Sequence, residues 1–328
     1  MSYGSGTLLD LSRLSNKVPA SVIHTIINAQ PLLDQMCFAM SNDGANNRSS
    51  VITDYPEGQF RRFNQGTKPE KAGGITQVDP TCMLNTWSKI DAKELKLNGG
   101  SAEWRYNQEK PFQRGIAHKV ARTIFCGSLK ADPDSINGLR TRYGKTGAGY
   151  EDVVIDAGGQ ASASKGLTDI FIVNWDRTLV HAIYPEGGVG GLQMTDRGEQ
   201  DAYDDQGRRY RAVITDYDWD LGLAVEDRRQ VVRIANIDVA SLTADASGSL
   251  DLVDMLIDAV EMFPESLGAG AAMYMTAPLR AMLRKQIRHC KNVNLDWETV
   301  AGRKVVSWDG IPVHKLPTSI LPNYAKPI

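Results

Sequence analysis

Apolar side chains recur at every fourth position between residues 109 and 126, which is the most regular pattern in the chain. The repeating positions are Phe112, Ile116, Val120 and Ile124. This spacing places them on one face of an α-helix, and the opposite face carries Arg114, His118, Lys119 and Arg122. Gly127 comes directly after the repeat and favours the end of the helix. The pattern predicts an amphipathic helix of about 18 residues, or roughly 27 Å, that packs on a sheet through its apolar face.

A two-residue alternation, typical of β-strands, replaces this pattern between residue 50 and about residue 97. It is seen in Ile75 and Gln77, and again in Met83, Asn85, Trp87 and Lys89. The sequence FRRFNQGTKPEKAGG, residues 60–74, is polar and rich in glycine. Because this segment has almost nothing to bury, we expect two strands joined by a long loop that projects from the body as an arm.

The remaining patterns indicate short helices and strands. A helix is expected just before Pro31, and short strands are expected between residues 151 and 240, where Gly, Asp and Pro separate apolar runs. A helix that Ser249 can cap follows, then a strand over residues 271–275 and a second helix after Thr276. Asp309-Gly310 predicts a hairpin turn. These elements together predict an α+β protein.

The same patterns divide the chain into five regions. They are an N-terminal arm with a short helix (1–49), a two-stranded extended loop (50–97), the long helix and the loop after it (98–150), a β-rich region (151–245) and an α+β unit (246–328).

Composition and charge narrow the class of protein. With 42% hydrophobic and 23% charged side chains, the 328 residues have the composition of an ordinary globular protein. The net charge of −2 argues against a broad basic surface for nucleic acid. Residues 1–128 carry 15 basic and 11 acidic side chains, whereas residues 129–250 carry 13 and 20. This uneven distribution fits either copies that meet through complementary faces or an ordinary solvated surface.

Candidate sites for a metal or a reaction are few. The cysteines Cys37, Cys82, Cys126 and Cys290 lie far apart, so neither a disulfide framework nor a zinc site is predicted. No apolar run approaches the roughly 18 residues of a membrane span, so we expect a soluble chain without a membrane partner. No catalytic motif is present, and we expect no cofactor, no metal and no enzymatic activity.

One row of carboxylates gives a weak hint of calcium binding: Asp216, Asp218 and Asp220. Asp227 falls at the position of the last ligand of a calcium loop, but Gly222 lies one place late for such a loop. Tyr217 and Trp219 alternate with the carboxylates. A strand with a wet carboxylate face and an aromatic inner face therefore explains the same residues.

The order of the expected elements, together with several short motifs, resembles the major capsid proteins of tailed double-stranded DNA bacteriophages, in the short-tailed variant of the Hong Kong 97-like fold. The motifs are Arg61-Arg62-Phe63-Asn64-Gln65-Gly66 with Lys68-Pro69, Cys82-Met83-Leu84 through Ile90-Asp91, and Gly138-Leu139. The resemblance implies an axial domain, a peripheral domain with a spine helix, and an extended loop. The β-rich region precedes the last α+β unit, which leaves a rearranged connectivity open.

The resemblance also implies a function. Copies would assemble as hexamers and pentamers into an icosahedral shell around the phage DNA, in a virion whose protein is made in the bacterial cytoplasm. Further partners would be a cement or decoration protein, a portal and a separate scaffolding protein.

Three groups of residues follow as candidates. Contacts between subunits would use Phe60, Arg61, Arg62, Phe63, Lys68, Lys71 and Trp87. The spine helix would pack through Phe112, Ile116, Val120 and Ile124, and DNA on the inner face would meet Arg114, Lys119 and Arg122. Two alternatives stay open at this point: an encapsulin-like nanocompartment shell, and a β-rich calcium-dependent or carbohydrate-active enzyme.

Overall fold

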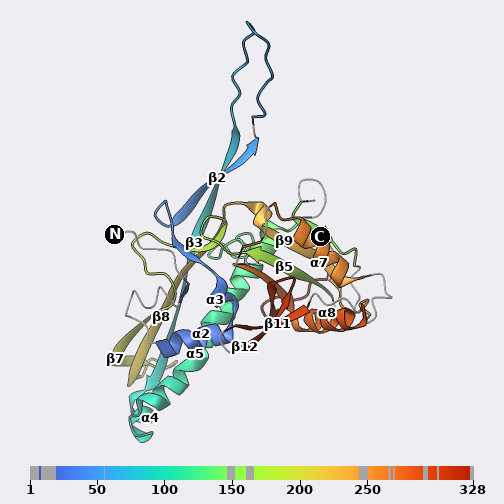
Figure 1. Ribbon diagram of the computed structural model, residues 1–328. Coiled ribbons are helices and arrows are strands. Elements are labelled where there is room, and N and C mark those ends of the chain that lie inside the picture. The colour runs from blue at the N-terminus through green and yellow to red at the C-terminus, as the bar shows by residue number, and fades with distance from the viewer. Residues whose placement is uncertain are drawn as a thin grey trace.

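Two β-sheets and a long helix that packs against both of them form the body of the protein, and a narrow arm projects from it (Figure 1). The computed structural model describes residues 7–8, 20–54, 56–145, 152–159, 166–243, 250–264, 267–268, 270–290, 295–300 and 303–325.

The first sheet carries the arm. Its strands, in spatial order, are β1 (Phe38–Met40), β6 (Val180–Tyr184), β8 (Arg209–Val225), β3 (Gly73–Asp91) and β2 (Asn46–Asp54), with β7 (Gln193–Tyr203) also paired to β8. All of these pairs are antiparallel except β1 with β6. Since β3 is 19 residues long, it reaches from the base of the arm to the far end of the sheet.

The second sheet joins strands from both sides of residue 245. Its order is β11 (Leu295–Val300), β12 (Arg303–Trp308), β13 (Ile311–Leu316), β10 (Ala271–Thr276), β5 (Leu167–Asn174), β9 (Val231–Asp238) and β4 (Val154–Asp156). The expected division between residues 151–245 and 246–328 is therefore not a division between sheets. Strand pairing across large sequence separations, which periodicity does not report, causes this difference.

The helices lie on the faces of these sheets. They are α2 (Ala20–Ala29), α3 (Leu32–Gln35), α4 (Ala92–Leu97), α5 (Ala102–Cys126), α6 (Leu139–Arg142), α7 (Leu252–Glu261) and α8 (Ala277–Cys290), with a 3-10 turn, η1, at Arg228–Gln230. The apolar faces of α7 and α8 pack on one face of the second sheet. The opposite face of that sheet shares a core with α5 and the first sheet.

Helix α5 begins at Ala102, seven residues before the start that the apolar repeat predicts. The Ser101 side chain caps it by accepting a hydrogen bond from the Trp104 amide at 3.4 Å. Its first turns are polar and are held by charge: Arg105 donates to Glu109 at 2.9 Å and to Asp196 at 2.8 Å. An apolar repeat cannot reveal a helix start that is held by hydrogen bonds and ion pairs. The predicted end at Gly127 is confirmed.

Strand β7 lacks the apolar run by which short strands were expected between residues 151 and 240, and β8, with 17 residues, is longer than those short strands. Along β7 almost every side chain is at least partly exposed, so the strand has no apolar alternation. It is held instead by pairing with β8 and by cross-strand ion pairs such as Arg209 with Asp201 at 2.7 Å. Gly222 keeps β8 continuous where it passes Ile183, because a Cβ there would lie 2.5 Å from the Ile183 side chain.

The turn between β12 and β13 is the predicted one, whereas α7 is capped by a residue other than the predicted cap. Asp309 and Gly310 have φ values of 51° and 73° and join β12 to β13, as the Asp-Gly signal predicts. Helix α7 is capped by Asp251, whose carboxylate accepts from the Val253 amide at 2.9 Å. The predicted cap, Ser249, lies outside the residues that the structure describes.

A buried ion cluster ties the second sheet to α6 and to the C-terminal segment. The Asp169 carboxylate, on β5, accepts hydrogen bonds from Arg233 on β9, Arg140 on α6 and the Tyr324 hydroxyl, each at 2.8 Å. The side chains of Asp169 and Arg233 are completely buried. Arg233 also donates to the Tyr143 carbonyl at 2.6 Å, so four separate segments converge on this cluster.

Candidate assembly interface

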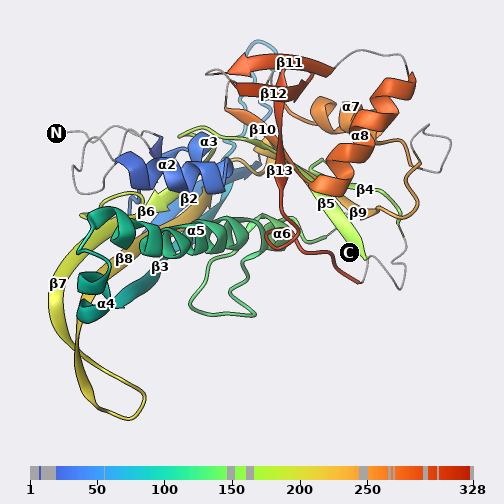
Figure 2. The same cartoon turned by 90° about the horizontal axis from the view of Figure 1, so that it is seen from below.

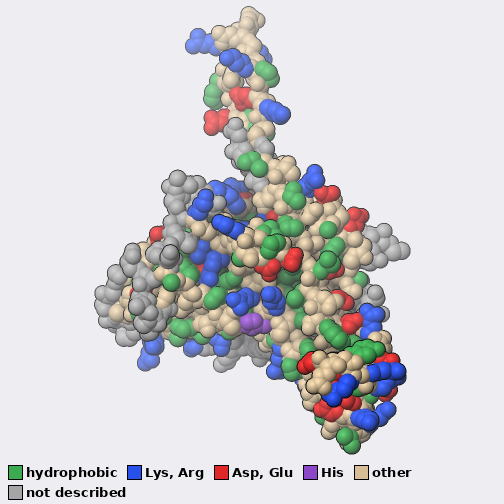
Figure 3. Space-filling view, turned by 180° about the vertical axis from the view of Figure 1, so that it is seen from behind, with side chains coloured by type: hydrophobic (Ala, Val, Ile, Leu, Met, Phe, Trp, Pro, Cys, Tyr) green, Lys and Arg blue, Asp and Glu red, His purple; other side chains and the backbone are tan. Residues whose placement is uncertain are grey.

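The arm consists of the ends of β2 and β3 and the segment 56–72 that connects them (Figure 1). Every residue from 56 to 72 is exposed. Figure 3 shows Lys and Arg side chains gathered around its end. The expected projection of this polar segment from the body is thus what the structure shows.

Hydrogen bonds within the arm set its shape. The Glu70 carboxylate accepts from the Gly58 amide and from the Gln59 side chain, both at 3.0 Å, and so joins the two sides. At the tip the Gln65 amide donates to the Arg62 carbonyl at 3.2 Å, and Asn64 has a φ of 63°, a conformation that Asn tolerates well. The arm therefore has a defined turn without any contact to a core.

The end of the arm combines apolar rings with positive charge. The Phe60 and Phe63 side chains are fully exposed. Their neighbours supply the basic groups Arg61, Arg62, Lys68 and Lys71, all of them exposed as well. Burying each of these phenyl rings in a contact would contribute a favourable free energy of about 1.5–3 kcal/mol, which the rings do not gain while they are exposed to water. A tip of this kind fits a surface that offers both an apolar contact and carboxylates.

Trp87 lies far from this tip, although the sequence analysis groups it with the arm. It sits on the outer face of β3, 52% exposed, next to the more exposed Met83. At about 3.3 Å per residue it is roughly 46 Å along the strand from Gly73, where the arm begins. The Lys89 ammonium lies 5.7 Å from the Trp87 ring centre. The structure therefore places the predicted contact residues at two separate positions.

Three carboxylates form a row on the same outer face: Asp216, Asp218 and Asp220. Their cross-strand partners on β3 are Trp87, Asn85 and Met83. Burial, together with the charge of Asp218, raises the pKa of Asp220. Tyr217 and Trp219, between them, are completely buried in the core. The interpretation as a strand with a wet carboxylate face and an aromatic inner face is confirmed.

The same geometry removes the calcium-loop alternative. Asp216 to Asp220 lie on a continuous strand, and Asp227 instead caps the 3-10 turn η1 by accepting from the Arg229 amide at 3.0 Å. Among the residues the structure describes, no group of three His, Cys, Asp or Glu side chains is arranged to hold a metal ion.

Helix α5 buries most of its predicted apolar face. Ile116, Val120 and Ile124 are buried in the main core, but Phe112 is 38% exposed and stacks at 6.5 Å on the Tyr217 ring. The apolar buried stripe therefore starts one turn later than the repeat predicts, because the side chains that α5 buries around Phe112 are polar: Glu109 and Gln113. The basic side chains Arg114, Lys119 and Arg122 are all exposed.

An open apolar groove runs between α5 and β3, and the sequence analysis missed it. It has a volume of about 500 Å³ and is lined by Leu84, Asn85, Thr86, Pro111, Phe112, Gly115, Ile116 and Lys119. Gly115, which lacks a side chain, and the outlying Phe112 open this space. The groove and the carboxylate row lie on opposite faces of β3: Leu84 and Thr86 share the face of the buried Trp219 and Tyr217, whereas Asn85 donates a hydrogen bond to Asp218 on the outer face.

Other features give no sign of chemistry. Cys37, Cys82 and Cys126 are free thiols, and burial raises the pKa of each, that of Cys82 to about 11. None of the described helices is both long enough and apolar enough to cross a lipid bilayer.

Comparisons with known proteins agree with this geometry. The family model of major capsid protein GP7 matches residues 15–320. A structure of bacteriophage epsilon15 aligns with 85% of this chain and 84% of its own chain, at 28% identity and a TM-score of 0.64. No curated protein matches the sequence.

Two more distant likenesses add no argument. The capsid of bacteriophage JBD30 aligns with 86% of this chain and 88% of its own, at 10% identity and a TM-score of 0.47. An encapsulin complex from Synechococcus elongatus aligns with 68% and 89%, at 10% identity and a TM-score of 0.42.

Proposed function

Because the chain belongs to the major capsid protein GP7 family, we propose that its copies join as hexamers and pentamers through the projecting arm. Formation of an icosahedral phage shell and the Hong Kong 97-like fold are established by the family and by the likeness to epsilon15. The observation that carries the proposal is the complete exposure of Phe60 and Phe63 at the end of an arm with no core of its own.

The arm would lie on a neighbouring copy. The groove between α5 and β3 offers an apolar contact for the tip, and the carboxylate row on the opposite face of β3 offers a charged one. Trp87, which lies on this outer face, would belong to the receiving surface rather than to the tip. Contacts of this kind, repeated around each ring, would make the monomer dependent on its neighbours for burial of the arm.

Replacing both tip rings, Phe60→Ala with Phe63→Ala, should leave a soluble, folded chain that forms few particles. Truncation of both rings removes roughly 3–6 kcal/mol of burial free energy from each contact between two copies. It removes no contact within one copy, because both rings are fully exposed there. Electron microscopy and a sizing column measure the loss of particles, and circular dichroism measures folding. Thr67→Ala, on the same arm, is the matched control. Normal particle numbers from the double variant would contradict this role of the arm.

The exposed basic face of α5 would contact packaged DNA on the inside of the shell. Arg114, Lys119 and Arg122 extend over more than two turns, a length that can follow a phosphate backbone. This surface is small, which agrees with the slightly negative charge of the whole chain.

Arg122→Glu should reduce the DNA held per particle while particles still form. A reversed charge weakens phosphate contacts without touching the core or the groove between α5 and β3, since Arg122 is exposed and does not line that groove. The ratio of nuclease-protected DNA to protein in purified particles measures the effect, and Lys130→Glu on the loop after α5 serves as the control. An unchanged ratio would place this face of α5 away from the DNA.

The proposed partners and location of the protein follow from its role as a capsid protein. A capsid protein is part of the virion, and we propose that this one is made in the bacterial cytoplasm and meets a portal, a scaffolding protein and a cement or decoration protein there. Its role is structural, and we propose that it carries out no reaction. The family match and the strand geometry of residues 216–220 disfavour the calcium-dependent or carbohydrate-active enzyme, and the distant encapsulin likeness gives the nanocompartment no support.

A further inference from the structure

Helices α7 and α8 lie side by side on the same face of the second sheet (Figure 2). Helix α7 packs over β9, and α8 packs over β10 and β13. Each helix buries one apolar face in the shared core, through residues such as Leu256 on α7 and Leu283 on α8. Their other faces point away from this core.

The outward face of α7 is acidic. Four exposed residues, at the spacing i, i+3, i+4 and i+7, form one stripe, here called the acidic stripe: Asp254, Ile257, Asp258 and Glu261. Helix α7 contains no basic residue. Ile257 is 43% exposed in the middle of the stripe, so the surface offers an apolar contact as well as charge.

The outward face of α8 is basic and has the same spacing. Its four exposed residues form the basic stripe: Ala281, Arg284, Lys285 and Arg288. Helix α8 contains no acidic residue. Burial and the neighbouring charge of Arg284 lower the pKa of Arg280, which lies at the inner border of this stripe. The described outward face of α8 thus carries three basic side chains and no acidic side chain of its own helix.

The two stripes do not neutralise each other within one copy. No ion pair joins Asp254, Asp258 or Glu261 to any residue in the described parts of the chain, and the same is true of Lys285 and Arg288. Both stripes lie on the sides of neighbouring helices that point away from the core beneath them. One lobe thus presents two neighbouring stripes of opposite charge.

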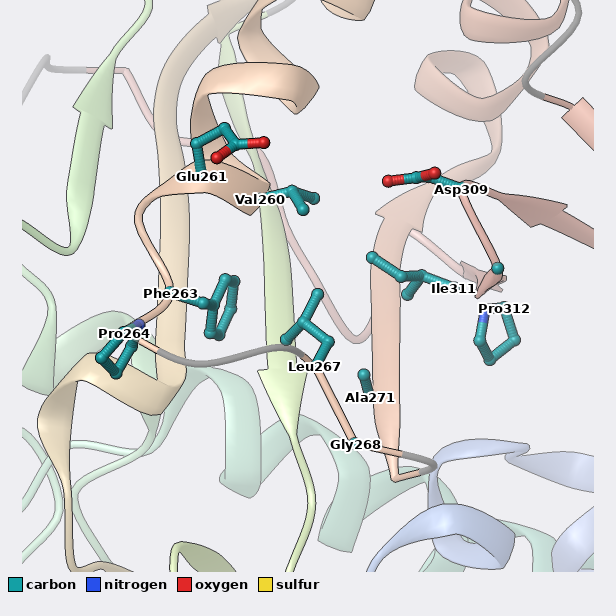
Figure 4. Close-up of a pocket in the computed structure, with 11 residues that line it drawn as sticks. Val260, Glu261, Phe263, Pro264, Leu267, Gly268, Ala271, Asp309, Ile311 and Pro312 are labelled. Atoms are coloured by element: carbon teal, nitrogen blue, oxygen red, sulfur yellow. The ribbon is translucent and has the colours of Figure 1, made fainter.

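A hollow at the end of α7 extends the acidic stripe. It has a volume of about 590 Å³, and the carboxylates of Glu261 and Asp309 stand on opposite sides of it (Figure 4). Phe263, Leu267 and Ile311 give it apolar walls. The negative end of the α7 dipole also points here. An aliphatic stem that ends in a cation, as in Lys or Arg, fits this combination.

We propose that the acidic stripe of one copy binds the basic stripe of a second copy, head to tail around each ring of the shell. The occupant of each stripe is thus another molecule of this same chain, and the inference rests on the shell function above. Two different surfaces on one subunit generate closed rings when the rotation between copies closes. Each stripe spans two helical turns, about 10 Å, so the acidic and basic side chains can meet over a matching length.

Reversing one charge in a stripe should reduce ring formation. Asp258→Lys alone changes the charge of the acidic stripe from −3 to −1, and Lys285→Glu alone changes that of the basic stripe from +3 to +1. Each change also places like charges against each other at the altered position of every contact between copies, so the yield of rings should fall about ten-fold. The double variant with both changes should assemble again. Native mass spectrometry and electron microscopy count the rings, and thermal unfolding followed by circular dichroism shows that each single variant is folded.

Mixing the two single variants separates contacts between copies from contacts within one copy. When the variants alternate around a six-membered ring, every contact joins an altered stripe to an altered stripe or an original one to an original one. The mixture should therefore form six-membered rings in higher yield than either variant does alone. Five copies cannot alternate, so five-membered rings should stay reduced in the mixture and recover only in the double variant.

Two charge changes outside the stripes serve as controls for this experiment. Asp134→Lys and Lys130→Glu, on the loop after α5, carry the same charge changes on exposed sites outside the stripes and should assemble normally. If Asp258→Lys does not fold, Asp254→Lys paired with Arg288→Glu repeats the test. Normal rings from the single variants, or rescue in the double variant but not in the mixture, would overturn the proposal. If the unaltered chain formed no shells at all, the shell function itself would be wrong instead.

Discussion

Asp169→Ala is expected to lower the free energy of unfolding by about 3–5 kcal/mol. The Asp169 carboxylate is the common acceptor for Arg233, Arg140 and Tyr324. Its removal leaves the fully buried Arg233 guanidinium without its counter-charge. Because a domain of this size has a net stability of only about 5–15 kcal/mol, much of the chain should be recovered in insoluble form.

Chemical denaturation of the soluble fraction and the soluble yield measure this loss. Asp43→Ala is the matched control, since Asp43 pairs with Arg48 at 3.0 Å on the exposed surface and should cost no more than about 1 kcal/mol. An Asp169→Ala chain as stable as the parent would show that the buried cluster contributes little to folding.

Ile116→Asp should destabilise the chain by a similar amount, several kcal/mol. Ile116 is buried in the core that α5 shares with both sheets, so a carboxylate there would lose most of its contact with water. Either the charge is buried at high cost or α5 moves away from the sheet. In both cases the stability of the monomer should fall, and thermal unfolding of the isolated chain measures this loss apart from any contact between copies.

Two substitutions on the same helix separate these effects. Ile116→Val removes one methylene group and should cost only about 0.5–1.5 kcal/mol. Lys119→Glu, on the exposed face less than one turn away, should change stability by about 0.5 kcal/mol at most. Thermal unfolding of the three variants measures the order. Equal soluble yield and equal midpoints for Ile116→Asp and Lys119→Glu would show that this face of α5 is not packed.

Local patterns predicted those elements whose stability depends on near neighbours in sequence. The four-residue repeat identified the buried face of α5 from Ile116 onward, and its glycine stop is where the helix ends. The polar composition of residues 60–74 predicted the arm, and Asp309-Gly310 predicted the turn. Each of these depends on contacts or dihedral angles within a few residues, which the sequence displays directly.

Contacts between distant residues were not readable in this way. Asp169 and Arg233 lie 64 positions apart, and each interrupts an apolar run, so the signal was an isolated charge in a buried strand with no indication of its partner. Strand β7, with its polar faces, is a strand only because β8 pairs with it. The first turns of α5 are held by Asp196 and Thr215, which come from the other sheet strands.

By itself, the sequence determined the α+β class, the arm with its aromatic and basic tip, and the apolar and basic faces of α5, because periodicity and composition act over a few residues. Only the tertiary structure decided that Trp87 lies away from the arm tip, that one sheet spans residue 245, and that the acidic and basic stripes lie on neighbouring helices of one lobe. These features arise from pairing and packing between residues far apart in the chain, whose free energy depends on which surfaces meet in three dimensions.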